Sequence, residues 1–234
     1  RHRNLVPPFV VKKKRFAEGL HRTRLFHGEY DADHPGHSMG GLYKSREGDS
    51  TISIHHNLFA HNNNRNPAIG NYDADDTFDA DIRNNVIYSC RNMGYVSGAS
   101  QRVRVNYLGN YGVFGPASRS DDLFRGNEDS NVQIYQQGNL LDAFPDGRVS
   151  GLDGGWRMFG DDYSRLDAPV NLAPVITETA EEALRTVLDR AGARPWSRDR
   201  ADVRIVRDVE AGTGGLIDSQ SDVDGWGPLD PGDA

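Results

Sequence analysis

The sequence has a single cysteine, Cys90, among 234 residues, so an internal disulfide cannot form and the fold must depend on packing and hydrogen bonds. It also lacks long apolar runs. Hydrophobic residues make up 36% of the chain and the mean hydropathy is −0.68. No stretch approaches the ~20 apolar residues that a membrane-spanning helix needs. These absences exclude a disulfide scaffold and predict no membrane segment, while the length suffices for a sizeable core.

Lysine is also scarce outside the first residues. The formal net charge is −7, which argues against nucleic acid as the main partner because phosphate neutralisation needs a basic surface. Three of the four lysines occupy positions 12–14, and the fourth is Lys44. We expect residues 1–15 to be an atypical basic leader, either the junction of a truncation or a solvated arm. Its short, proline-interrupted apolar stretch does not fit a signal peptide.

Four segments repeat one pattern, in which alternating apolar residues are followed shortly by asparagine. Alignment of the apolar residues gives steps of 28, 23 and 29 residues, through Ile54, Ile82, Val105 and Ile134. Such alternation is typical of strands, and the intervening stretches are rich in turn-forming residues. We therefore predict an all-β fold, a right-handed parallel β-helix of about five rungs, over residues 16–165.

Stacked rungs bring outward side chains of neighbouring strands together. In the alignment above, Asp79 and Asp81 pair with Arg102 and Arg104 of the next rung, a structural use of four charges. An asparagine also recurs where each strand gives way to a turn. Because asparagine tolerates the left-handed conformation, we expect local turn chemistry at these positions, Asn57, Asn85, Asn110 and Asn139.

The pattern changes in the tail, residues 166–234. Thr179 and Glu182 form a capping box before an apolar stripe that ends near Gly192, which predicts a helix of about twelve residues. A second, short amphipathic piece is expected around Val206. The tail should cover one end or flank of the β-helix, because an open sheet edge is prone to association.

Histidine is absent after His61. Adjacent residues of a strand point to opposite faces, so the spacing of these histidines does not predict a metal site. Polar, cleft-lining roles are favoured over plain structural ones. Five histidines fall in the first repeats together with Arg65, and these are His34, His37, His55, His56 and His61.

Several ordered motifs together resemble the pectate lyase family of polysaccharide lyases. They extend over residues 17–227 and include His37–Leu42, Ser53–Asn62, Arg65–Pro67 and Gly212–Gln220. The resemblance also implies a parallel β-helix. It further implies cleavage of polygalacturonate, or pectate, by β-elimination, with calcium neutralising the substrate carboxylate, in a secreted or periplasmic protein.

The resemblance assigns roles to individual residues. Arg65, in the Arg-x-Pro motif, matches the base that removes the C5 proton of the sugar. The ordinary pKa of arginine, above ~12, would by itself favour a carboxylate clamp instead. His37 falls near a cationic substrate-binding position, Lys44 is a second candidate for that work, and His56 is expected to support the cleft.

The chain departs from the family pattern at the calcium site. Family ligands precede the His-Ser-x-Gly motif, where Glu18 is the only carboxylate before Glu29. We therefore leave the metal ligands unassigned. Two acidic groups offer suitable oxygen donors but match no family position, and these are Glu29, Asp31 and Asp33, and Asp73, Asp75 and Asp76.

Two other functions stay open on the sequence. The chain could be a noncatalytic scaffold that binds acidic polysaccharide. It could also be a hydrolase that uses a carboxylate pair such as Asp75 and Asp79.

Overall fold

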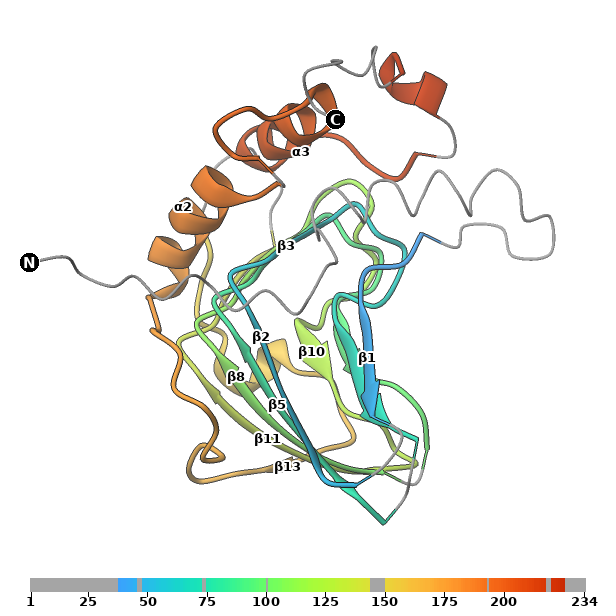
Figure 1. Cartoon of the computed structure of the whole chain (residues 1–234), viewed down its shortest axis with the longest axis vertical. Helices are drawn as coiled ribbons and strands as arrows, with labels where there is room; N and C mark the ends of the chain where they lie inside the picture. Colours follow the sequence, from blue (N-terminus) through green and yellow to red (C-terminus); the bar gives the residue numbers. More distant parts are fainter. Residues whose placement is uncertain are drawn as a thin grey trace, which may run out of the picture.

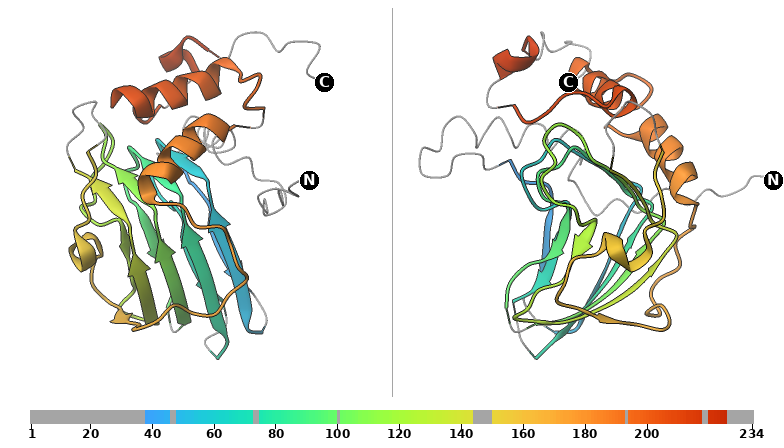
Figure 2. Two further views of the ribbon diagram at one scale, coloured as in Figure 1. Left: turned by 90° about the vertical axis from the view of Figure 1, so that its left-hand side faces the viewer. Right: turned by 180° about the vertical axis from the view of Figure 1, so that it is seen from behind.

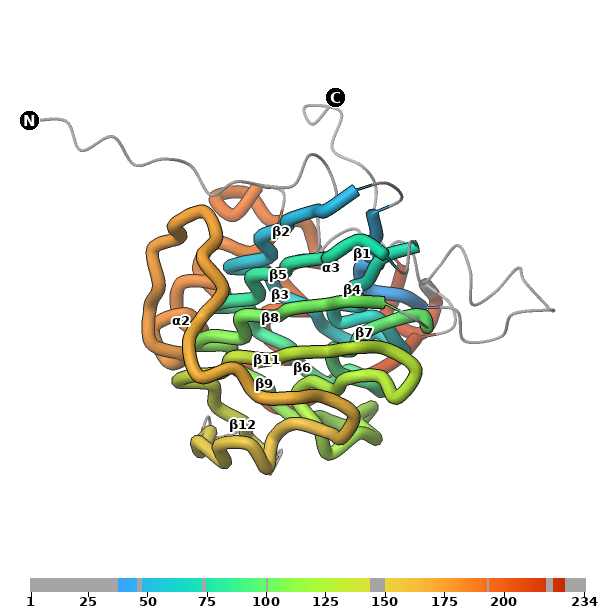
Figure 3. Tube along the Cα trace, turned by 90° about the horizontal axis from the view of Figure 1, so that it is seen from below, coloured from blue at the N-terminus to red at the C-terminus, as the bar shows by residue number. Residues whose placement is uncertain are grey.

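The predicted parallel β-helix is confirmed by the computed structural model (Figure 1). The structure describes residues 38–45, 48–72, 75–99, 101–143, 150–192, 194–217 and 220–225. The proposed leader, residues 1–15, lies outside the described residues. Successive turns of chain lie one below the other when the molecule is seen from below (Figure 3). No helix in the described part of the chain is long and apolar enough to cross a membrane.

Three parallel sheets form the walls of the β-helix. Sheet A has the order β1 (Leu42–Ser45), β4 (Ala68–Asn71), β7 (Gly94–Val96) and β10 (Phe124–Arg125). Sheet B has the order β13 (Ser164–Arg165), β11 (Asn131–Gln137), β8 (Arg102–Leu108), β5 (Thr77–Arg83) and β2 (Ser50–His55). Sheet C has the order β12 (Leu140–Asp142), β9 (Tyr111–Val113), β6 (Val86–Tyr88) and β3 (Leu58–Ala60). The described residues thus make four turns, and the two-residue β13 adds the start of a fifth in place of the five full rungs expected.

The interior is filled by columns of inward side chains from sheet B. Ala80, Val105 and Ile134 are fully buried at matching positions of β5, β8 and β11. A 3₁₀ turn, η1 (Gly155–Met158), leads into Phe159, whose ring packs edge-on against Tyr107 at 5.4 Å. Burial of such large side chains contributes about 1.5–3 kcal/mol each.

The expected register between β5 and β8 is wrong by two residues. Ile82 lies opposite Tyr107, not Val105, so the step between these strands is 25 residues. The alternating pattern could not reveal this, because a shift of two residues leaves every side chain on the same face. The charge pairs change with it. Asp79 meets Arg104, and Asp81 accepts hydrogen bonds from Arg83 of its own strand at 2.6 and 2.9 Å.

A ladder of asparagines, buried except for the half-buried Asn57 at its start, joins the turns of the β-helix between sheets B and C. The side-chain amide of each asparagine donates to the side-chain oxygen of the next, at 2.9–3.0 Å, through Asn57, Asn85, Asn110 and Asn139. That oxygen also accepts from the backbone N–H of the preceding asparagine, at 2.9–3.1 Å. The expected local turn chemistry is therefore wrong for most of these contacts, which link neighbouring turns instead.

The left-handed conformation belongs to the residue before each ladder asparagine. His56, Asn84, Gly109 and Gly138 have φ values of 55°, 53°, 57° and 65°. A positive φ bends the chain between the two sheets, and it favours Gly and Asn. The four equivalent bends therefore have the same backbone geometry although their residue types differ.

The tail contains two helices rather than one, both beside the β-helix (Figure 2). The helix α2 (Ala180–Arg190) has the predicted capping box of Thr179 and Glu182. The expected amphipathic piece is a full helix, α3 (Arg200–Ala211), and a short 3₁₀ turn, η2 (Gln220–Val223), follows. Apolar residues of α2 and α3, among them Val187 and Ile205, pack in one cluster with outer residues of sheet C. The tail thus covers a flank.

Residues 166–179, here called the crossing segment, lead from β13 across the outer face of sheet B to α2 (Figure 2). Two buried asparagines hold it. The side chain of Asn106 both donates to and accepts from the backbone of Val170, at 2.9 and 2.8 Å. The side chain of Asn84 does the same with Glu178, at 2.8 and 3.0 Å. Each clamp satisfies a buried amide and fixes one point of the segment.

We expect Asn85→Ala to lower the free energy of unfolding by about 3 kcal/mol, because several buried donors and acceptors lose their partner at once. The losses include the bonds from Asn57 and the bond to the carbonyl of Ile54. Urea titration with a fluorescence readout measures the change. Asn131→Ala, at an exposed position with no side-chain partner in the described residues, serves as control and should cost about 0.5 kcal/mol or less. Equal midpoints for the two variants would contradict the prediction.

Candidate functional site

Arg65 lies in the turn between β3 and β4, shortly before β4 enters sheet A. Its φ is 65°, a left-handed value that is uncommon outside glycine. The Gly40–Gly41 pair packs against its backbone, and the N–H of Gly41 donates to the carbonyl of Arg65 at 2.7 Å. A β-carbon at Gly40 would overlap that carbonyl, so only glycine fits there. The glycine motif and the Arg-x-Pro motif therefore converge on one turn.

The side chain of Asn64 also supports this turn, since its oxygen accepts from the N–H of Arg65 at 2.9 Å. Asn66 is buried, accepts from Asn62 at 3.0 Å and donates to the carbonyl of Asn92 at 2.8 Å. The side chains of these asparagines therefore stabilise the loop that carries Arg65. Within the described part of the chain, the guanidinium of Arg65 has no hydrogen bond or ion pair, so it is available to a ligand.

Lys44 is the other predicted site residue that the structure places near Arg65. Burial lowers the pKa of Lys44, and the charge of Arg65 lowers it further. Lys44 lies opposite Gly70 in sheet A, and its ammonium stands 4.7 Å from the ring centre of Tyr72. Tyr72 was missed by the sequence analysis, because the strands of sheet A are too short to show a pattern. Two cations and an aromatic ring thus share this face.

The remaining predicted site residues are not joined to this pair. His37 lies outside the described residues. His56 sits at a bend after β2, where its contacts are with His55 and Glu178 and none reaches Arg65 or Lys44. Its role in supporting the cleft stays a prediction. His56 has the same left-handed backbone conformation as Asn84, Gly109 and Gly138, and its structural role is to form the bend between sheets B and C.

His55 and His56 form a coupled pair at the end of β2. Their Nδ1 atoms are 3.0 Å apart, and His56 Nε2 lies 3.6 Å from the carboxylate of Glu178. Burial lowers the pKa of His55, as do the charges of His56 and Arg83. Burial also lowers the pKa of His56, and the nearby Glu178 only partly opposes this. The folded protein therefore favours neutral rings.

His61 anchors the tail instead of lining a cleft. Its buried Nε2 lies 3.2 Å from the carboxylate of Asp208 in α3, and its ring meets Tyr88 edge-on at 5.2 Å. Thr213 donates to the same carboxylate at 3.1 Å. Burial by itself raises the pKa of Asp208, but the hydrogen bonds from His61 and Thr213 and the charges of His61 and Arg204 together outweigh it, and the net pKa is lowered. This contact between distant segments could not be predicted from the spacing of the residues.

The described residues contain no group of three His, Cys, Asp or Glu side chains that could hold a metal ion. Of the acidic residues considered for calcium, Asp76 accepts from the N–H of Gly48 at 2.6 Å and Asp75 is almost fully exposed. Glu29, Asp31, Asp33 and Asp73 lie outside the described residues. The donor set in the described residues therefore does not fit calcium.

The carboxylate pair considered for a hydrolase is not a site either. Both oxygens of Asp79 accept hydrogen bonds from the guanidinium of Arg104, at 2.7 and 2.6 Å. This bidentate ion pair already engages both oxygens of Asp79, so the carboxylate is held for structure rather than left free for a substrate. Asp75 is 96% exposed, and one of its oxygens lies 4.0 Å from the guanidinium of Arg102, so it is not held toward Asp79.

The chain is similar to curated proteins named probable pectate lyase C. The relative from Aspergillus flavus is 33% identical over 208 residues, which cover 84% of this chain and 45% of the relative. Relatives from Aspergillus oryzae and Aspergillus fumigatus are 32% and 30% identical over the same shares. No protein-family model matches the chain. The chain spans about half the length of these relatives, and they confirm the resemblance that the motifs indicated.

We expect the stability of the protein to decrease as the pH falls below the ordinary histidine pKa of 6.5, because His55 and His56 have lowered pKa values in the folded state. Below that pH the unfolded chain binds protons more readily than the folded one. Urea midpoints at about pH 7.5 and about pH 5 measure the loss. His55→Gln removes one ring and relieves its neighbour, so the variant should lose less stability over this interval. An equal loss in both proteins would contradict the assignment.

Proposed function

We propose that this chain, a homologue of the curated pectate lyases over most of its length, forms part of a lyase that cleaves pectate by β-elimination, with Arg65 as the base. One observation carries the proposal. The Arg-x-Pro turn and the Gly-Gly motif, which are separate in the sequence, pack together and present, within the described residues, an unpaired guanidinium beside Lys44.

The chemistry requires a base at C5 of a uronate residue. The base takes the C5 proton, the C–H electrons form a C4–C5 double bond, and the C4–O bond breaks. The departing oxygen keeps the electron pair of the broken C4–O bond and takes up a proton. Negative charge grows on the C5 carboxylate in the transition state, so a cation beside it accelerates the step.

Lys44 suits that second role. Lys44 lies in β1 of sheet A near Arg65, and its ammonium stands 4.7 Å from the ring centre of Tyr72, the residue after β4. An arginine acts as a base only in its neutral form, which desolvation and neighbouring cations favour in general. The roles proposed for Arg65 and Lys44 require no metal ligand among the described residues.

The outer face of sheet A extends this arrangement along the axis of the β-helix. Tyr95 of β7 lies opposite Ala68 of β4, and Arg125 of β10 lies opposite Tyr95. Neighbouring strands are ~4.8 Å apart, so these side chains form a row beside the reacting centre. The row offers an aromatic ring and a further cation to a linear acidic glycan.

Arg65→Lys and Arg65→Ala test the base. We expect kcat on polygalacturonate to fall by about 10²–10⁴-fold, because a positioned base contributes that much. The readout is the ultraviolet absorbance of the unsaturated product. Arg207→Ala, an exposed arginine on α3, has the same change of charge and should retain full activity. Wild-type activity in Arg65→Ala would refute the proposal, and reducing ends without the absorbance would indicate a hydrolase.

Lys44→Met tests whether the charge of Lys44 contributes to the reaction. The variant keeps the apolar stem over the ring of Tyr72 and removes the charge. We expect kcat/KM to fall by about tenfold or more, since a cation close to a developing charge is worth about 1.4 kcal/mol or more. Wild-type kcat/KM in this variant would remove Lys44 from the site, and a noncatalytic scaffold would bind polygalacturonate without turnover in every variant.

A further inference from the structure

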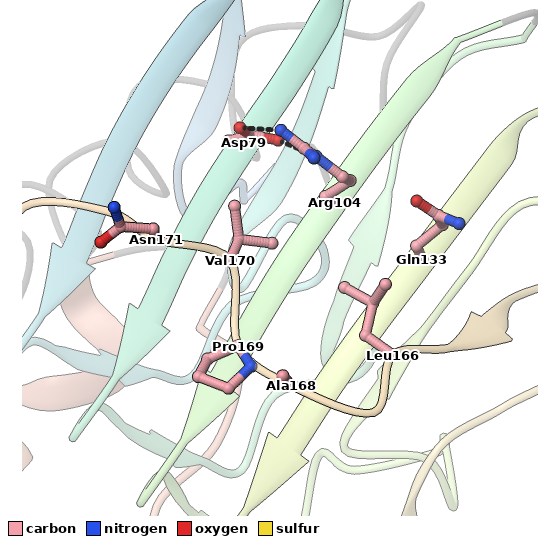
Figure 4. A pocket seen from close by; sticks show the side chains of 8 residues that line it. All are labelled: Asp79, Arg104, Gln133, Leu166, Ala168, Pro169, Val170 and Asn171. Atoms are coloured by element: carbon pink, nitrogen blue, oxygen red, sulfur yellow. Dashed lines mark hydrogen bonds and ion pairs between the residues drawn. The ribbon is translucent and has the colours of Figure 1, made fainter.

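A hollow lies on the outer face of sheet B, away from the turn that carries Arg65. The crossing segment stands off the sheet and leaves a pocket of about 390 Å³ beneath it (Figure 4). A pocket of about 230 Å³ continues along the same strands and shares Arg104 and Gln133 with the first. We call the two together the outer groove. Its size falls in the usual range of ligand sites.

The floor of the outer groove is an ion pair that points into it. Figure 4 shows Asp79 and Arg104 side by side on neighbouring strands, joined by two hydrogen bonds. The ion pair leaves lone pairs on the carboxylate and further N–H groups on the guanidinium. The floor can therefore both accept and donate hydrogen bonds.

The walls add unpaired polar groups and an apolar surface. Within the described residues, the side-chain amides of Gln133 and Asn131 have no hydrogen-bond partner. Arg102 is 56% exposed, and its nearest carboxylate oxygen, on Asp75, is 4.0 Å away. The crossing segment contributes Leu166 and Pro169 on the opposite side. Donors, acceptors and an apolar wall in one shallow groove match the hydroxyls and C–H faces of a sugar chain.

The charges of the outer groove identify the kind of sugar. Arg104 is neutralised by Asp79, and the charge of Asp49 also acts on Arg104. Asp75 is the carboxylate next to Arg102. With its cations matched by carboxylates, the groove offers no excess positive charge to a polyanion. A neutral ligand loses nothing from this balance.

We propose that the outer groove binds a neutral oligosaccharide. This function is separate from the proposed lyase, because the groove lies on sheet B and Arg65 lies at the edge of sheet A. A protein that holds a neutral glycan on one face and an acidic one on another would be retained on a polysaccharide that contains both.

Isothermal titration calorimetry with the full chain tests the proposal. The probes are three neutral trisaccharides, a galactotriose, a xylotriose and an arabinotriose, and the acidic trigalacturonate. We expect at least one neutral probe to bind, and Gln133→Ala with Arg102→Ala to weaken it by about tenfold or more, as the loss of charged and neutral hydrogen bonds predicts. Both side chains are at least partly exposed and make no contact that the fold depends on. Arg207→Ala is the matched control and should bind normally.

The outcomes separate this proposal from the lyase. Binding of no neutral probe, or equal affinity in the double variant and the wild type, would overturn the outer groove as a site for neutral sugars. Trigalacturonate binding that the double variant abolishes would overturn it too, in favour of an acidic ligand. The activity of the double variant on polygalacturonate is measured separately, and it should equal that of the wild type because neither residue lies near Arg65.

Discussion

Each turn of the β-helix is held in register with the next by a buried asparagine whose amide spans the gap between them. The contact is possible because the preceding residue takes the left-handed conformation and turns the asparagine inward. An unsatisfied buried amide costs about 1–3 kcal/mol, so a slipped register would lose several such contacts at once. The apolar columns add much more energy, but they tolerate a shift of two residues. The ladder supplies the specificity that the columns lack.

Buried polar side chains also hold the tail against the β-helix. Asn84 and Asn106 each clamp a peptide of the crossing segment, and His61 meets Asp208 beneath α3. These three polar contacts connect residues far apart in sequence, and the apolar faces of α2 and α3 then close over sheet C. Consequently the outer faces of the three sheets differ. Sheet C is covered by helices, sheet B is crossed by one segment, and sheet A presents Lys44.

The fold could be predicted from the sequence because a repeat of alternating apolar residues is a local signal that recurs. The capping box of α2 was equally local. The 25-residue step between β5 and β8 could not be predicted, since Ile82 fits opposite either Val105 or Tyr107 by face alone. Residues of the candidate site could be predicted only where a motif marked them. Arg65 and Lys44 come together, whereas Tyr72, Glu178 and Asp208 gain their roles from contacts between distant segments that no spacing encodes.

The position of Arg65 follows from the stacking of turns rather than from its own contacts. Its backbone is gripped by Gly41 from the preceding turn, and Asn66 is tied to Asn92 in the following turn. The side chain itself is left unbound in the described part of the chain, so the preorganisation resides in the backbone. The backbone of Arg65 therefore needs no reorganisation before a ligand arrives, because the neighbouring turns already hold it. Register and the placement of this turn are one constraint: whatever keeps the turns of the β-helix aligned also positions the backbone of Arg65.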